Sequence, residues 1–84
     1  MPEIFNLLGY SFFFYSKEHL PVHVHVEGND GYAIFDWDEE NSTFVERECF
    51  NIKGGDLKKI RKAIDERSQQ IFDKWNDHFN RDNL

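Results

Sequence analysis

The fold is decided between residues 22 and 37, which read VHVHVEGNDGYAIFDW. Three valines alternate with His23, His25 and Glu27, and this period of two is typical of a strand with one apolar face. Residues 28–31 supply Gly, Asn, Asp and Gly, which tolerate the backbone angles of tight turns. An apolar pattern resumes at Tyr32 and ends at Trp37. The stretch therefore predicts a β-hairpin with strands over residues 22–27 and 32–37.

The two strands of this hairpin also suggest their own register. If Glu27 pairs with Tyr32, then His23 lies opposite Asp36 and the two apolar sets fall on one face. Those sets are Val22, Val24 and Val26 on the first strand and Ala33, Phe35 and Trp37 on the second. On the other face, the His23 ring can donate a hydrogen bond to Asp36, which would fix its tautomer. The register thus predicts a core face and a histidine face.

The rest of the chain supplies two more strands and a helix. The aromatic run over residues 10–15 favours a strand that seeks burial on both faces, and residues 16–21 form a turn. After an acidic loop, residues 44–50 favour a fourth strand. Asp56 is a good N-cap for a helix that runs to about His78. Its apolar face is marked by Leu57, Ile60, Ile64, Ile71 and Trp75.

We therefore expect a single α+β domain over residues 1–84. An antiparallel meander of about four strands precedes one long C-terminal helix, which packs on the valine face. A helix of about 23 residues is roughly 35 Å long, whereas four strands make a sheet under roughly 20 Å wide. The helix must overhang the sheet or kink near residues 68–70. An overhang would leave apolar surface exposed, which predicts a homodimer or a protein partner.

Composition excludes several classes of protein. A single cysteine, Cys49, excludes an internal disulfide and a four-thiolate zinc site. The apolar runs are too short to span a membrane and no secretory signal opens the chain, so we expect a cytoplasmic protein without membrane contact. The net charge is -6, made up of -8 over residues 1–50 and +2 over residues 51–84. This charge disfavours nucleic-acid binding unless the basic helix is presented alone.

The histidine strand is the main chemical signal. Residues two apart on a strand share a face at about 6.5–7 Å, so His23 and His25 can reach one ion. Glu27 is next in line, and His19 can fold back from the turn. These ligands suit zinc, nickel or iron, although the fold requires no cofactor. Without a metal, His23 and His25 can serve as acid and base in RNA cleavage, with Asp36 as the orienting group. A third interpretation leaves the histidines as structural groups on the wetter sheet face.

Basic residues crowd the first turns of the predicted helix, where the helix dipole disfavours cations. They are Lys58, Lys59, Arg61 and Lys62. A phosphate-bearing partner would explain them, and so would a solvated face that Asp65 and Glu66 partly neutralise.

A wider pattern joins several of these features. It comprises Gly9, Phe12-Phe13-Phe14-Tyr15-Ser16, Glu18, Pro21, His23-Val24-His25-Val26, Leu57, Ile60 and Trp75. The pattern resembles the bacterial family catalogued as domain of unknown function 4160, over nearly the whole chain. Members often have Pro where this chain has Val22, and His19 is not a steady feature, so the resemblance supports His23 and His25 over His19. It implies a toxin–antitoxin-like pair with a small co-encoded protein.

Two classes of function stay open on the sequence alone. The first is a protein-interaction module that uses exposed aromatic surface. The second is a small ribonuclease or metal-binding enzyme centred on His23 and His25.

Overall fold

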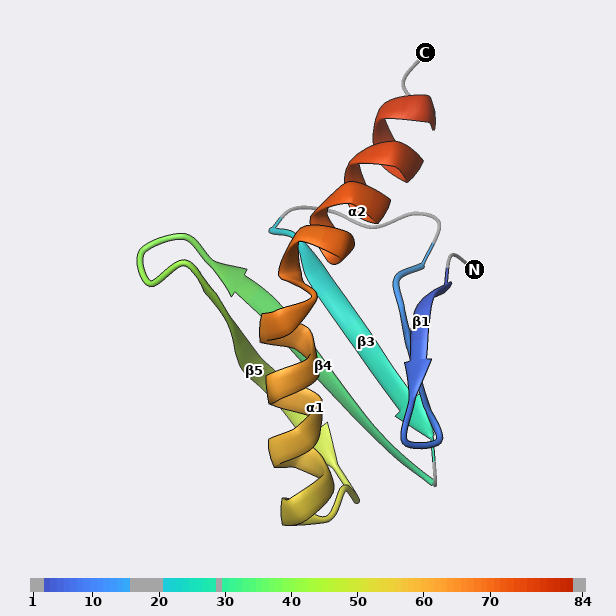
Figure 1. Ribbon diagram of the computed structural model, residues 1–84, viewed down its shortest axis with the longest axis vertical. Coiled ribbons are helices and arrows are strands. Elements are labelled where there is room, and N and C mark those ends of the chain that lie inside the picture. Colours follow the sequence, from blue (N-terminus) through green and yellow to red (C-terminus); the bar gives the residue numbers. More distant parts are fainter. Residues whose placement is uncertain (1–2, 16–20, 29, 83–84) are drawn as a thin grey trace.

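The computed structural model describes residues 3–15, 21–28 and 30–82, without the side chains of residues 79–82. Its strands form one antiparallel sheet in chain order, and two helices follow (Figure 1). The elements are β1 (Glu3–Leu7), β2 (Tyr10–Phe13), β3 (His23–Gly28), β4 (Gly31–Asp38), β5 (Thr43–Phe50), α1 (Gly54–Glu66) and α2 (Ser68–Asp82). The expected α+β meander is confirmed, but it has five strands rather than about four, and two helices rather than one.

The central hairpin has the predicted register. Glu27 pairs with Tyr32, Val24 with Phe35 and His23 with Asp36. At the turn each strand runs one residue further than predicted, so Gly28 pairs with Gly31. The four-residue loop expected from the sequence was therefore too long. At the other end β3 begins at His23 rather than at Val22, and β4 continues to Asp38. The predicted turn over residues 16–21 lies almost wholly outside the described residues.

The additional strand, β1, forms a second hairpin with β2. Leu8 and Gly9 connect them with positive φ angles of 57° and 80°. Two consecutive positive φ angles are typical of the tight turns whose twist matches antiparallel strands. Gly9, which the sequence suggested only as the residue before a strand, is therefore half of a hairpin turn.

The helical segment breaks at Arg67, where φ is -112° and ψ is 20°. The apolar face of this segment includes Ile64 and Ile71. Between them, the positions that would face the sheet hold Arg67 and Ser68, which are polar. No buried apolar side chain therefore holds that turn against the core, and serine is a weak helix former. The break falls one residue before the kink considered at residues 68–70. The helix begins at Gly54 with Lys53 at the N-cap, so Asp56 is not the cap and lies in the first turn.

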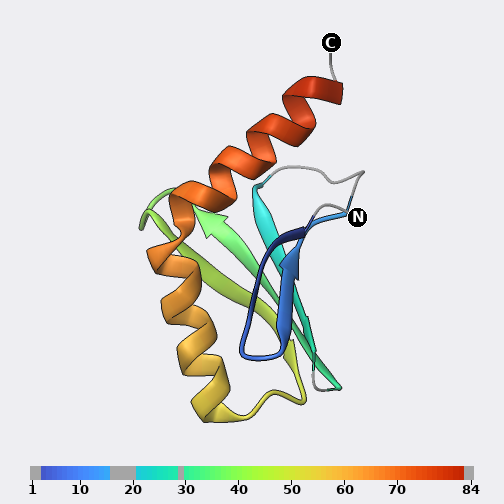
Figure 2. The same ribbon diagram turned by 45° about the vertical axis from the view of Figure 1, so that its right-hand side comes forward.

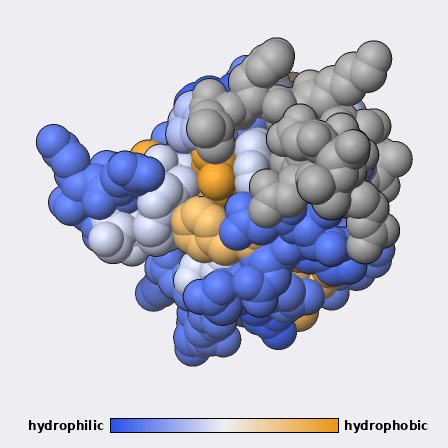
Figure 3. All heavy atoms as spheres, turned by 90° about the horizontal axis from the view of Figure 1, so that it is seen from above, coloured by the Kyte–Doolittle hydropathy of each residue, from blue (hydrophilic) through white to orange (hydrophobic). Residues whose placement is uncertain are grey.

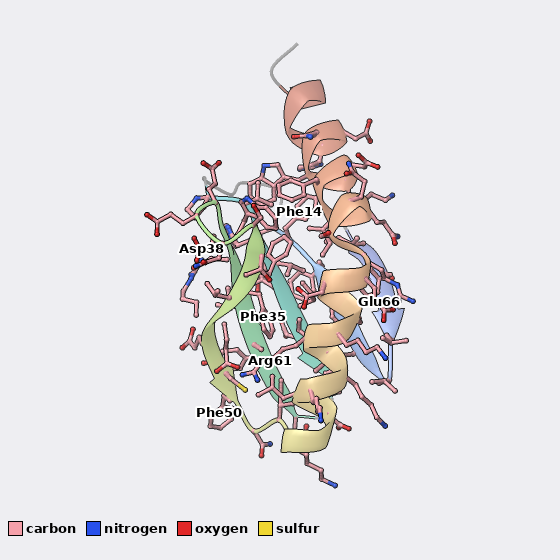
Figure 4. The ribbon with its side chains drawn as sticks, turned by 60° about the vertical axis from the view of Figure 1, so that its left-hand side comes forward. Phe14, Phe35, Asp38, Phe50, Arg61 and Glu66 are labelled. Carbon is pink, nitrogen blue, oxygen red and sulfur yellow. The ribbon has the colours of Figure 1, made fainter. Side chains whose placement is uncertain are left out.

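The core lies between the helices and the predicted valine face. Val24, Val26, Ala33 and Phe35 are buried there, with Val22 and Trp37 at its margin. The helices contribute Ile60, Ile64, Ile71 and Trp75. Figure 4 shows Phe35 in the interior of this layer and Phe14 close to α2. Burial of large apolar side chains contributes about 1.5–3 kcal/mol each, so the packing of the helices on this face stabilises the fold.

Both helices lie on the same face of the sheet (Figure 2). Within the described residues, no helix covers the other face, which we call the outer face. The α2 helix continues past the ends of the strands toward the C-terminus (Figure 1). The predicted overhang is therefore present, but it comes from α2 alone. Neither helix is long and apolar enough to cross a membrane, as far as the described residues extend.

Both edges of the sheet are irregular. The β1–β2 pairing shifts between Glu3 and Phe5, and the β4–β5 pairing shifts between Ile34 and Phe35. In the second bulge Arg47 is the extra residue, because Glu48 pairs with Ile34 and Glu46 with Phe35. Bulges and charged side chains on edge strands hinder pairing with another chain.

Candidate interaction surface and histidine strand

His23 lies at the end of the sheet and is buried, with 5% of its surface exposed. Its ring is 5.3 Å from Trp75 of α2 and 5.3 Å from His25, both measured between ring centroids. Its Nδ1 atom lies 2.9 Å from the Pro21 carbonyl oxygen. Because a carbonyl oxygen only accepts, Nδ1 carries the hydrogen, and Nε2 of a neutral ring is left as an acceptor. His23 is thus packed into the fold by groups from the chain before β3 and from α2.

Asp36 lies opposite His23, as the register predicted, and it makes a two-point ion pair. Arg47 donates from Nε and Nη2 to the two carboxylate oxygens, over 2.9 and 2.7 Å. These hydrogen bonds, helped by the positive potential of Arg47, hold the pKa of Asp36 below its ordinary value. Sequence analysis missed Arg47, which reaches Asp36 from the bulge in β5. Because Nδ1 of His23 already donates to the Pro21 carbonyl, a hydrogen bond from His23 to Asp36 requires a protonated ring that donates from Nε2, and that bond stays a prediction.

His25 is half-buried on the outer face and is surrounded by aromatic rings. It stacks on Phe13 with a centroid distance of 5.5 Å, and it meets the edge of Tyr15 at 4.7 Å. Together with Glu27, Tyr32 and Ile34 it lines a hollow of about 300 Å³. Of the two central histidines, His25 is therefore the one that a ligand on this face would meet.

The predicted metal site is not assembled by the described residues. Among the side chains that the structure describes, in residues 3–15, 21–28 and 30–78, no three from His, Cys, Asp or Glu come together as a possible metal site. Glu27 is exposed and lies four residues beyond His23 along the strand, which is roughly 13 Å at the usual rise. His19 lies outside the described residues. The metal hypothesis with His19, His23, His25 and Glu27 stays a prediction.

Aromatic and apolar side chains adjoin one another on the outer face. We call this set the aromatic patch, and its members are Tyr15, His25, Tyr32, Ile34 and Phe50. Tyr15 is 46% exposed and Phe50 is 59% exposed. Tyr32 lies 5.8 Å from Phe50 between ring centroids, and the two line a second hollow of about 440 Å³ beside the β3–β4 loop. Tyr32 and Glu27 line both hollows, so the patch is continuous across β3, β4 and β5.

Carboxylates border the aromatic patch. Glu27 lines both hollows and Asp30 lines the second one. Tyr32 donates a hydrogen bond of 3.0 Å from its hydroxyl to Glu48. Because this bond and the Glu48 charge favour the neutral phenol, they raise the pKa of Tyr32. Arg47 is engaged by Asp36, so among the residues that the structure describes the surroundings of the patch are acidic.

Sequence analysis did not find this patch. Tyr32 and Phe50 lie in strands that the expected meander pairs, but the sequence alone set no register for that pairing, and only the register places the two residues side by side. If the apolar patterns of residues 32–37 and 44–50 had been matched to find their register, as was done for the central hairpin, the patch would have been found.

The basic start of the helix is partly neutralised from within the fold. Arg61 donates to Glu46 of β5 over 2.7 Å, and Figure 4 shows it extending toward that strand. Lys62 lies 3.9 Å from Glu66. Glu46 was not foreseen as a partner. A phosphate-bearing partner for Lys58 and Lys59 stays a prediction.

Apolar surface is also visible at the end of the molecule seen from above, with hydrophilic residues beside it (Figure 3). Phe14 and Trp75 are buried, with their ring centroids 5.3 Å apart, and the Phe14 ring lies 5.6 Å from the ring of His78 in α2. Cys49 is half-buried, and burial raises the pKa of its thiol, which disfavours the reactive thiolate.

A comparison with protein families matches residues 9–76 to the family model described as domain of unknown function DUF4160. The chain belongs to this family. The match to DUF4160 begins within the β1–β2 turn and includes the histidine strand, the whole aromatic patch and Trp75. Strand β1 lies outside the matched residues. A search of curated proteins and a search of solved structures found no match.

Proposed function

We propose that this protein is a cytoplasmic protein-interaction module that binds a partner protein through the aromatic patch. The exposure of Tyr15, Tyr32 and Phe50 beside one another, on a face that neither α1 nor α2 covers, carries the proposal. Single exposed aromatic residues are ordinary on protein surfaces, whereas adjoining ones are typical of binding surfaces. Tyrosine and phenylalanine are also enriched in interfaces between proteins.

The partner approaches the face of the sheet rather than its edges. Both edge pairings contain a bulge, and β5 carries Glu46, Arg47 and Glu48 in succession. A strand added to β5 would meet an interrupted hydrogen-bond ladder and three charges. Binding by strand addition is therefore disfavoured, and contact through side chains of the outer face is favoured.

The family resemblance implies a toxin–antitoxin-like gene pair, which makes a small co-encoded protein the first partner to test. A homodimer formed through the same patch is the alternative. A complex with the co-encoded protein and a homodimer differ in mass, and only the first requires the gene of the co-encoded protein.

Site-specific cross-linking in the host cell tests the proposal. A photoreactive phenylalanine analogue is placed at Tyr32 or at Phe50, and at Lys58 on the exposed side of α1 as the control. We expect a discrete cross-linked product from positions 32 and 50, and none from position 58. Mass spectrometry identifies the attached chain. Absence of a product at both patch positions, or equal products at all three, would contradict the proposal.

A second candidate is a small ribonuclease or metal enzyme that uses His23 and His25. The observation in its favour is the 5.3 Å separation of the two rings, with His25 beside a hollow. Two imidazoles at this range can divide acid and base roles between them. The burial of His23 and the carboxylates around the hollow oppose a phosphodiester substrate.

Assays on purified protein without a histidine tag distinguish the interaction module from the enzyme. A ribonuclease would cleave RNA, and the double variant His23→Ala, His25→Ala would not. A metal enzyme would gain melting temperature with added zinc or nickel. If RNA stays intact and neither metal changes the melting temperature, the enzyme candidate is abandoned.

A further inference from the structure

We infer that the aromatic patch binds a cationic side chain, arginine or lysine, presented by an amphipathic segment of the partner protein. The inference rests on the proposed function and adds the chemistry of the partner. It follows from aromatic rings and carboxylates that border the same two hollows.

Aromatic rings line both hollows of the patch. Tyr15 and His25 border one hollow, Phe50 borders the other, and Tyr32 borders both. The faces of aromatic rings attract cations, most strongly where water is displaced. Arginine is favoured because its planar guanidinium stacks on such rings. Ile34, which also lines the first hollow, offers contact to the methylene stem of the same side chain or to an apolar neighbour.

Carboxylates lie beside the same rings. Glu27 borders both hollows, Asp30 borders one, and Glu48 is held beside Tyr32 by the hydrogen bond from the phenol. Arg47 is already engaged by the two oxygens of Asp36. Among the described residues of this face, carboxylates therefore outnumber cations. A cationic partner complements the patch, whereas a second copy of this chain would bring carboxylate against carboxylate.

A hexapeptide of alternating arginine and leucine, blocked at both ends, is the probe. It is titrated into ¹⁵N-labelled protein, and amide shifts are followed by NMR. We expect saturable shifts centred on Glu27, Tyr32, Ile34 and Phe50. Replacing arginine with glutamate in the peptide should abolish the shifts, and replacing leucine with serine should weaken them.

Matched variants test the carboxylates. The pair Glu27→Gln, Glu48→Gln should weaken binding of the arginine peptide about tenfold, since each lost ion pair contributes modestly at a surface. The control pair Glu39→Gln, Glu40→Gln removes the same charge from the exposed β4–β5 turn and should leave affinity within about twofold. All four substitutions are nearly isosteric, and the amide spectrum checks that each variant is folded.

Several results would overturn the inference. Equal loss of affinity in both variant pairs would mean non-specific attraction to an acidic protein. Equal binding of the glutamate peptide, or no binding of either peptide, would remove the cation preference. Shifts at the same residues on raising the protein concentration alone would make a second copy the occupant. If cross-links form at positions 32 and 50 while the peptide fails, the proposed function stands and only the cationic partner is wrong.

Discussion

His23 and His25 are near neighbours on one strand, but their surroundings differ. The alternation of the sequence placed them together, and their rings are in contact distance. It could not show that Trp75, from the far end of the chain, would bury His23 while His25 stayed half-exposed. At this scale the sequence pattern determines the strand, and tertiary packing determines which histidine a ligand can reach.

The ion pair between Asp36 and Arg47 should make the stability of the protein depend on pH. Because Arg47 lowers the folded-state pKa of Asp36 below 3.8, the ion pair adds stability above that pH, and this contribution is lost as the pH falls through the folded-state pKa. Asp36→Asn should therefore lower the free energy of unfolding at pH 7 by about 1 kcal/mol, allowing for the partial exposure of Arg47. Urea denaturation of both proteins at descending pH should show that the difference between their free energies of unfolding shrinks as the wild-type carboxylate becomes protonated.

Glu66→Gln is the control for that measurement. Its pair with Lys62 is 3.9 Å long and both side chains are largely exposed, so the change in stability should stay within about 0.5 kcal/mol. If the free energies of unfolding of wild type and Asp36→Asn differ by the same amount at every pH, the stated role of the ion pair is contradicted.

Among the elements, the central hairpin was predictable and the outer ones were not. The alternation between residues 22 and 37 has a single register that places the three valines on the same side as Ala33, Phe35 and Trp37, so sequence alone selects it. Strand β1 was missed because Ile4, Phe5 and Leu7 do not alternate cleanly and its pairing with β2 is shifted. The helix break was foreseen only as a possibility, since helix propensity is a weak guide where one turn lacks a buried anchor.

Gly28 provides a prediction at the junction of two hairpins. A Cβ atom there would overlap the Gly9 carbonyl oxygen and lie 2.9 Å from the Tyr10 Cα. Both neighbours are backbone atoms, so relief requires movement of the β1–β2 turn against β3. Gly28→Ala should therefore lower the free energy of unfolding by about 1–3 kcal/mol. Chemical denaturation followed by circular dichroism measures this.

Gly55→Ala is the matched control. Apart from its chain neighbours and the backbone of its own helix, nothing lies within 4 Å of the place that a Cβ would take at Gly55, and the residue is helical. Alanine should stabilise the protein there by about 0.4–1 kcal/mol. Equal effects of the two substitutions would mean that the close approach of the turn to β3 does not constrain position 28.

On the scale of the whole molecule, the two sides of the sheet are specialised. One side takes both helices and carries the core, whereas the outer face combines exposed rings with carboxylates. The bulged edges hinder growth of the sheet from either end. The rings favour contact with another surface and the like charges oppose contact with an identical one, so charge decides between a different partner and a homodimer.

The balance between rings and charges predicts a salt effect on self-association. At about 0.1 M NaCl, where the screening length is about 10 Å, repulsion between outer faces should keep the 10.1 kDa chain monomeric. At about 1 M NaCl, where that length is about 3 Å, the rings should associate and the weight-average mass should rise. Light scattering measures both. Tyr32→Ser with Phe50→Ser should abolish the rise, whereas Leu8→Ser, which removes an apolar side chain exposed elsewhere, should not. A dimer at low salt that survives the double substitution would mean that the protein self-associates through another face, such as the overhanging α2.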